Sequence, residues 1–147
     1  MLRALVGLLL VSAVISCTDI RDFDGTWTGP RVGDNPVLNT GFAESATATL
    51  AIADVDLNRF RATLTTSGDE FRDAAIQELP AAEADSLAEL TFNTGQPARI
   101  YVTLVAATDG LGDATAFVSL HREDRVELRL VRGGQNPLYG IFFLERQ

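Results

Sequence analysis

The chain of 147 residues contains one cysteine, one histidine and no lysine. With Cys17 as the single cysteine, no internal disulfide can form, so the fold must be stabilised by packing. One histidine and one cysteine are too few for a zinc-type site, and we expect neither a metal nor a cofactor. The 12 basic residues, all arginine, are outnumbered by 20 acidic residues and spread along the chain. This pattern argues against a nucleic-acid partner.

The chain also lacks an apolar run long enough to cross a bilayer as a helix, which takes roughly 20 residues. Its N-terminal apolar run covers residues 4–15, follows Arg3 and is interrupted only by Gly7 and Ser12. A basic residue followed by a short apolar run is typical of an export signal. We therefore expect residues 1–16 to be a signal peptide that is cleaved.

The end of this run reads VISC, residues 14–17, and differs from the Ala-x-Ala-like site of a plain secretory signal. It resembles the lipobox of bacterial lipoproteins, in which branched apolar and small residues precede an obligatory cysteine. The resemblance implies that Cys17 is lipidated and that the mature chain is anchored in the bacterial cell envelope. Thr18 after the cysteine favours the outer membrane over the inner. An ordinary signal peptide with a chance cysteine, or an uncleaved anchor, is the alternative.

The mature chain is long enough for one domain with a core of its own. We expect residues 17–22 to form the lipidated cysteine and a short tether, and residues 23–147 to form the domain. The five residues between Cys17 and Phe23 span at most about 20 Å when extended. The domain is therefore expected to lie close to the membrane.

Alternation of apolar and polar residues dominates the chain from residue 23 onward, as in half-buried strands. It is clearest over residues 46–52, 60–64, 100–104 and 126–130. Turn-forming residues separate these runs, as at 67–69, 109–113 and 133–137. This spacing predicts an all-β fold with eight or nine antiparallel strands, arranged as an up-and-down barrel that removes its own edges.

Residues 74–90 fit this pattern less well, because they are rich in alanine, glutamate and leucine. Here we expect a strand over 70–79, a loop or single helical turn over 80–86, and a further strand over 87–93.

The first expected strand begins with FDGTWTG, residues 23–29. The glycine and tryptophan at Gly25 and Trp27 resemble the G-x-W signature of lipocalins. In that family the tryptophan closes one end of an eight-stranded barrel and packs against an arginine near the end of the last strand. The resemblance implies that Trp27 contacts Arg146. It also implies that Gly25, Trp27 and Arg146 have a structural role in closing the barrel. A ligand-stacking role for Trp27 is the alternative.

The expected interior mixes alanines with larger apolar residues. An eight-stranded barrel is just wide enough either to fill itself with side chains or to hold one small ligand. A ligand in such an interior would be apolar, for example a lipid or fatty acid. The candidate lining residues are Leu38, Phe42, Phe60, Ile100, Leu104, Val118 and Phe142. The first two lie in the long connection 30–45, which is expected to cover the open mouth.

Catalytic chemistry is not expected, and we predict that the protein is not an enzyme. Ser119 and His121 are predicted to point outward onto a solvent face, where they form no enclosed site. Residues 54–65 begin like a calcium-binding EF-hand loop, but Arg59 occupies the position of the required glycine.

Two functions remain open. The first is a membrane-anchored lipoprotein whose lipocalin-like barrel binds a small apolar ligand. The second is a structural or protein-binding envelope lipoprotein with a filled barrel, for example an inhibitor of a basic enzyme, since the chain has a net charge of −8. A void beneath residues 30–45 favours the first function, and an interior filled with side chains favours the second.

Overall fold

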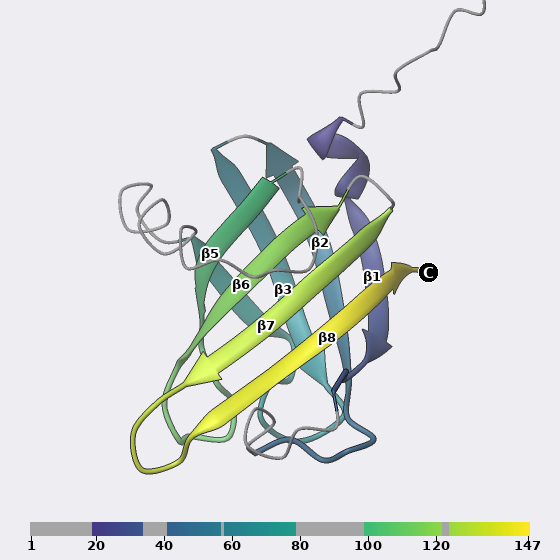
Figure 1. Ribbon diagram of the computed structural model, residues 1–147. Helices are drawn as coiled ribbons and strands as arrows, with labels where there is room; N and C mark the ends of the chain where they lie inside the picture. Colours follow the sequence, from purple (N-terminus) through teal and green to yellow (C-terminus); the bar gives the residue numbers. More distant parts are fainter. Residues whose placement is uncertain (1–18, 34–40, 57, 79–98, 122–123) are drawn as a thin grey trace, which may run out of the picture.

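The computed structural model describes residues 19–33, 41–56, 58–78, 99–121 and 124–147. Within these ranges eight strands form a closed antiparallel barrel, in which each strand pairs with the next and the last pairs with the first (Figure 1). The predicted all-β, up-and-down barrel is confirmed.

A short 3-10 helix, η1 (Ile20–Phe23), precedes the barrel. The strands are β1 (Gly25–Pro30), β2 (Thr47–Asp56), β3 (Arg59–Thr66), β4 (Ala74–Glu78), β5 (Arg99–Val105), β6 (Ala114–His121), β7 (Arg125–Arg132) and β8 (Leu138–Arg146). No helix within the described ranges is both long and apolar enough to span a bilayer.

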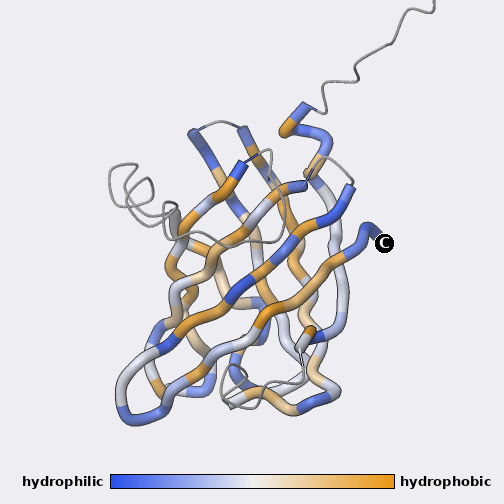
Figure 2. The backbone as a smooth tube through the Cα atoms, in the orientation of Figure 1, coloured by the Kyte–Doolittle hydropathy of each residue, from blue (hydrophilic) through white to orange (hydrophobic). Residues whose placement is uncertain are grey.

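Alternation explains why these segments become strands with one buried face. In β3, Phe60, Ala62 and Leu64 are buried, and the residues between them are exposed or half-buried. Cross-strand partners continue the same face, as Leu64 lies opposite Leu50 of β2. The inward residues of the strands join into one hydrophobic core. Figure 2 shows the resulting alternation of hydrophilic and hydrophobic residues along the tube, for example in β7.

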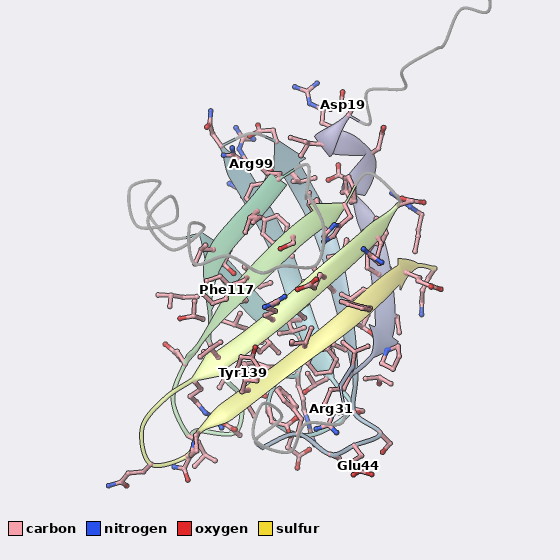
Figure 3. All side chains as sticks on the ribbon, in the orientation of Figure 1. Asp19, Arg31, Glu44, Arg99, Phe117 and Tyr139 are labelled. Atoms are coloured by element: carbon pink, nitrogen blue, oxygen red, sulfur yellow. The ribbon has the colours of Figure 1, made fainter. Side chains whose placement is uncertain are left out.

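The antiparallel order gives the barrel two different ends. The N-terminal end holds η1, the start of β1 and the end of β8. The opposite end, which we call the loop end, holds the connections 67–73, 106–113 and 133–137 and the described parts of the β1–β2 connection, 31–33 and 41–46. Figure 3 labels Asp19 and Arg99 at the N-terminal end and Glu44 at the loop end.

The start of the fold differs from the sequence prediction. Residues 20–22 were expected to be tether, but they belong to η1, and Ile20 packs against the hydrophobic core. The Asp19 side chain caps this helix by accepting a hydrogen bond from the Arg21 amide at 3.1 Å. The folded domain therefore begins before Phe23.

The fourth strand is shorter than predicted. It begins at Ala74 instead of residue 70, because the preceding residues form a tight turn. In that turn the Thr66 amide donates to the Phe71 carbonyl at 2.9 Å, and Asp73 has a left-handed backbone with a φ of 48°. The loop predicted for 80–86 and the strand predicted for 87–93 lie outside the described residues.

Strand β5 turns the opposite face to the core from the one predicted. Tyr101 and Val105 belong to the core and pair with inward residues of β6, whereas Ile100 and Leu104 lie on the outer surface. Both faces of this strand are largely apolar, so alternation alone gives no contrast between them. A one-residue difference in parity exchanges the two faces completely.

Candidate functional site

The N-terminal end of the barrel is closed by Trp27 and Arg146, which are cross-strand partners. The Arg146 guanidinium carbon lies 4.6 Å from the centroid of the Trp27 ring. Trp27 is fully buried, its indole N–H donates to the Phe23 carbonyl at 2.9 Å, and its ring stacks on that of Phe23 at 5.4 Å. The contact predicted from the G-x-W resemblance is present, and it gives Trp27 a structural environment.

Arg146 also ties the two ends of the folded chain together. Its guanidinium donates to the Asp24 carbonyl at 3.0 Å and to the Asp22 carbonyl. Gly25 leaves room for this group, because a Cβ there would lie 3.2 Å from Arg146 Nη1. Gly25 also has a φ of 131°, which only glycine adopts readily. The last strand therefore holds η1 in place.

The predicted ligand-lining residues do not form one surface. Four of them, Phe42, Phe60, Val118 and Phe142, are buried in the hydrophobic core. The assignment of Ile100 and Leu104 to the interior is wrong, since both lie on the outer face of β5, where Leu104 is 38% exposed. Leu38 and Cys17 lie outside the described residues.

Aromatic rings occupy the barrel interior both near the N-terminal end and near the loop end. Phe60 of β3 and Tyr101 of β5 are stacked with centroids 4.8 Å apart, and the Tyr101 hydroxyl donates to the Asp56 carbonyl at the end of β2. Towards the loop end, the Phe42 and Phe142 rings meet edge to face at 5.2 Å. These ring pairs belong to the single hydrophobic core that the buried described residues form.

At the loop end, Thr108 joins the β5–β6 connection to the β3–β4 connection. Its amide donates to the Glu70 carbonyl at 2.9 Å, and its hydroxyl donates to the Asp69 carbonyl at 3.1 Å. The same hydroxyl oxygen accepts a hydrogen bond from the Arg72 amide at 3.0 Å. These bonds hold two loops, far apart in sequence, in a fixed relative position.

Arg132, at the end of β7, joins the β5–β6 connection to the β7–β8 connection. Its Nη1 donates to both carboxylate oxygens of Asp109, at 3.0 and 2.9 Å, and to the Gly112 carbonyl at 3.2 Å. Its Nε donates to the Asn136 carbonyl at 3.0 Å. The side chains of Arg132 and Asp109 are only 6% and 12% exposed, so this ion pair is largely buried and is supported by further hydrogen bonds.

The ion pair also sets the titration of Asp109. Burial of the carboxyl opposes its ionisation, but hydrogen bonds from the Leu111 amide and Arg132, together with the positive charge of Arg132, outweigh that effect. The pKa of Asp109 therefore lies below its ordinary value.

Between these braced loops lies an open cleft of about 420 Å³. It is lined by Gly41, Asp69, Glu70, Asp109, Leu111, Arg132, Gln135, Asn136, Pro137 and Leu138. Leu111 is 51% exposed and presents apolar surface at the cleft. Four loops contribute to the cleft, and hydrogen bonds fix three of them relative to one another, so most of the cleft is preformed.

The outer face of β6 and β7 is more buried than the sequence predicted. Ser119 and His121 do point outward, but each is only 4% exposed. Glu127 is fully buried and forms an ion pair with Arg129. Its Oε2 lies 4.0 Å from Nε2 of His121. The prediction that this face is open to solvent is wrong, because alternation identifies the side of a strand and not its exposure.

The residues that build the cleft, in particular Thr108 and Arg132, were not predicted from the sequence. One signal was available for the arginine. Val126, Leu128 and Leu130 mark the inward face of β7, and Arg132 has the same parity at the end of that strand. A charged residue in that position needs a buried partner. No comparable signal marked Thr108.

Within the described ranges, no three histidine, cysteine, aspartate or glutamate side chains converge closely enough to hold a metal ion. Comparison of the whole chain with protein-family models, curated proteins and solved structures finds no match.

Proposed function

We propose that the protein is a bacterial envelope lipoprotein, anchored through Cys17, whose barrel binds a protein partner at the loop end. This proposal rests mainly on the contrast between the barrel interior and the loop end. The described inward side chains join in one hydrophobic core with stacked aromatic rings, whereas the loop end has an open cleft of about 420 Å³.

The anchor would set the orientation of the barrel. Asp19 is the first described residue and lies at the N-terminal end of the barrel. It follows Cys17 by two residues, so the two Cα atoms are at most about 7 Å apart in any chain conformation. The N-terminal end would therefore face the bilayer, and the loop end would point away from it.

The loop end would then stand clear of the lipid. The nine residues of β8 extend about 30 Å along the strand. With the usual strand tilt, this length corresponds to a little over 20 Å along the barrel axis. A partner could approach the loop end from the aqueous side without contacting lipid.

The charge of the loop end indicates the kind of partner. Its described ionisable residues are Arg31, Glu44, Asp69, Glu70, Arg72, Asp73, Asp109, Asp113 and Arg132. Six of these are acidic and three are basic, so a basic protein surface is electrostatically favoured there. This supports the second of the two functions expected from the sequence, for which an inhibitor of a basic enzyme is one example.

Native mass spectrometry distinguishes a filled barrel from a lipid carrier. The mature protein is extracted from its own envelope with mild detergent, and its mass is compared with that of the acylated polypeptide. We expect no additional mass beyond the covalent acyl chains. A stoichiometric lipid-sized adduct that survives extraction and is absent after denaturation would overturn the filled-barrel proposal.

Photocrosslinking in intact cells tests the binding end. A photoreactive amino acid is placed at Leu111 of the loop end or at Asn58, an exposed residue of the β2–β3 turn at the N-terminal end. We expect a discrete crosslinked protein from position 111 and none from position 58. The same product from both positions, or no product from position 111, contradicts the proposal.

The anchor has an independent test. The Cys17→Ser variant is expected to lose both labelling by radioactive palmitate and sedimentation with membranes. Retention of both properties would show that the lipobox resemblance is misleading.

A further inference from the structure

The loop-end cleft combines carboxylates with an apolar wall. Its lining residues include three with carboxylates, Asp69, Glu70 and Asp109, and three apolar ones, Leu111, Pro137 and Leu138. From this combination we infer that the cleft receives a lysine or arginine side chain of the partner. The inference rests on the proposed function, because it assumes a protein that docks at the loop end.

An anionic occupant is disfavoured by the bonding of Arg132. Among the described residues that line the cleft it is the one arginine, and it already faces both carboxylate oxygens of Asp109 and two backbone carbonyls. Its charge is therefore compensated within the protein. Asp69 is likewise paired with a cation, Arg72, at the surface. The carboxylate of Glu70 would therefore be the main group that repels an incoming anion.

A cationic occupant finds acceptor capacity at Glu70. Its Oε2 accepts one hydrogen bond, from the Thr66 hydroxyl at 2.9 Å, whereas an ionised carboxylate can accept about four. The carboxylate lies close over Gly68, where a Cβ would come within 2.3 Å of Oε2. Glu70 is thus held in position before any partner arrives.

Asp69 adds a second carboxylate at the rim of the cleft. Its side chain is 81% exposed and forms a surface ion pair with Arg72. Such exposed pairs are weak, so a cation from a partner can share this carboxylate without breaking a structural contact.

The apolar wall fits the rest of such a side chain. Lysine and arginine have a hydrocarbon stem below the charged group, and the stem is buried most favourably against apolar surface. Leu111 offers that surface, since it is 51% exposed. A cleft of about 420 Å³ has room for one long side chain with part of its backbone.

The test uses two small probes that differ only in charge. Nα-acetyl-argininamide has the guanidinium group, and Nα-acetyl-citrullinamide has a neutral group of nearly the same shape. The mature chain, residues 17–147 with Cys17→Ser, is labelled with nitrogen-15 and titrated with each probe while amide signals are recorded by NMR. We expect saturable shifts of the Leu111, Gly112 and Asn136 amides with the arginine probe alone.

Charge-neutralising variants identify the carboxylate involved. Glu70→Gln should raise the apparent Kd for the arginine probe by about tenfold, the cost of one hydrogen bond to a charged group. The matched control is Glu145→Gln, an exposed carboxylate at the N-terminal end, which should leave the Kd unchanged. The exposed Asp69→Asn variant keeps the test available if Glu70→Gln disturbs the fold. Its Kd for the arginine probe is expected to be severalfold higher than that of the wild type.

Equal shifts with both probes, shifts confined to other parts of the barrel, or wild-type affinity in both carboxylate variants would overturn the inference. Its failure is separable from that of the proposed function. If Leu111 crosslinks a partner in cells but the arginine probe does not bind, the inference alone is wrong. If the probe binds as expected but no partner is crosslinked, the proposed function is wrong.

Discussion

Replacing Trp27 by alanine tests how the barrel is closed. Trp27 is fully buried, stacks on Phe23, donates to the Phe23 carbonyl and contacts the Arg146 guanidinium. Truncation of a large aromatic side chain in a core costs about 3–5 kcal/mol of unfolding free energy. A domain of this size has a total stability of about 5–15 kcal/mol. We therefore expect Trp27→Ala to lose a large fraction of its stability.

Two milder variants separate the contributions. Trp27→Phe keeps an aromatic ring but removes the indole N–H, so a loss of about 1–2 kcal/mol is expected from the hydrogen bond and the smaller ring. Arg146→Met removes the cation–π contact, which is worth about 0.5–1 kcal/mol at an exposed site. The Arg146 side chain is 38% exposed, so we expect the loss of the cation–π contact to cost about 0.5 kcal/mol of unfolding free energy. The loss of its hydrogen bonds to η1 adds to this cost.

Urea unfolding of the mature chain measures these changes. Far-UV circular dichroism is the appropriate signal, because Trp27 is the only tryptophan and its fluorescence is lost in both Trp27 variants. Equal m-values for all variants would show that the free energies are comparable. An unfolding free energy of Trp27→Ala within about 1 kcal/mol of wild type, well below the usual cost of such truncations, would refute the structural role given to this residue.

Two further substitutions, one of them with a control, probe the contact between β1 and β8 and the loop end. Gly29→Ala should destabilise by about 1–3 kcal/mol or more, because its Cβ would lie 1.7 Å from the Phe143 carbonyl oxygen. Gly133→Ala, where a Cβ meets nothing within 4 Å, is the control and should stay within about 0.5 kcal/mol of wild type in urea unfolding. Asp109→Asn should cost about 1.5–3 kcal/mol at pH 7. Since the folded pKa of Asp109 is lowered, its stabilisation is present above about pH 4 and is lost as the pH falls through the folded pKa. The wild-type advantage over Asp109→Asn should therefore shrink in acid, and an advantage independent of pH would contradict this account.

How much of the fold could be predicted depended on the contrast between the two faces of each strand. In β3 the inward face is Phe60, Ala62 and Leu64, and the outward face is arginine and threonine, so the sequence indicates the orientation directly. In β5 the faces are Ile100, Val102 and Leu104 against Tyr101, Thr103 and Val105. The outward Val102 is itself only 1% exposed, so apolar character does not identify the core side there.

The closing contact was accessible to sequence reasoning because it involves the first and last strands, whose pairing follows from the closure of the barrel. The loop end was not accessible in this way. Its bonds join residues far apart in sequence, such as Thr108 with Glu70 and Arg132 with Asp109. Loops have no periodicity from which such contacts could be read. Their geometry depends on the register of four separate strand pairs.

The two ends of the barrel differ in what a substitution there should change. At the N-terminal end, Trp27 is fully buried and Arg146 joins the last strand to η1, so changes there act mainly on stability. At the loop end, Asp69 and Leu111 have most or half of their surface in solvent, and substitution of such residues usually changes stability by less than about 0.5 kcal/mol. Binding at the cleft can therefore be altered while the barrel stays folded. Arg132 is the exception, because the same buried guanidinium both braces the loops and neutralises Asp109 beside the cleft.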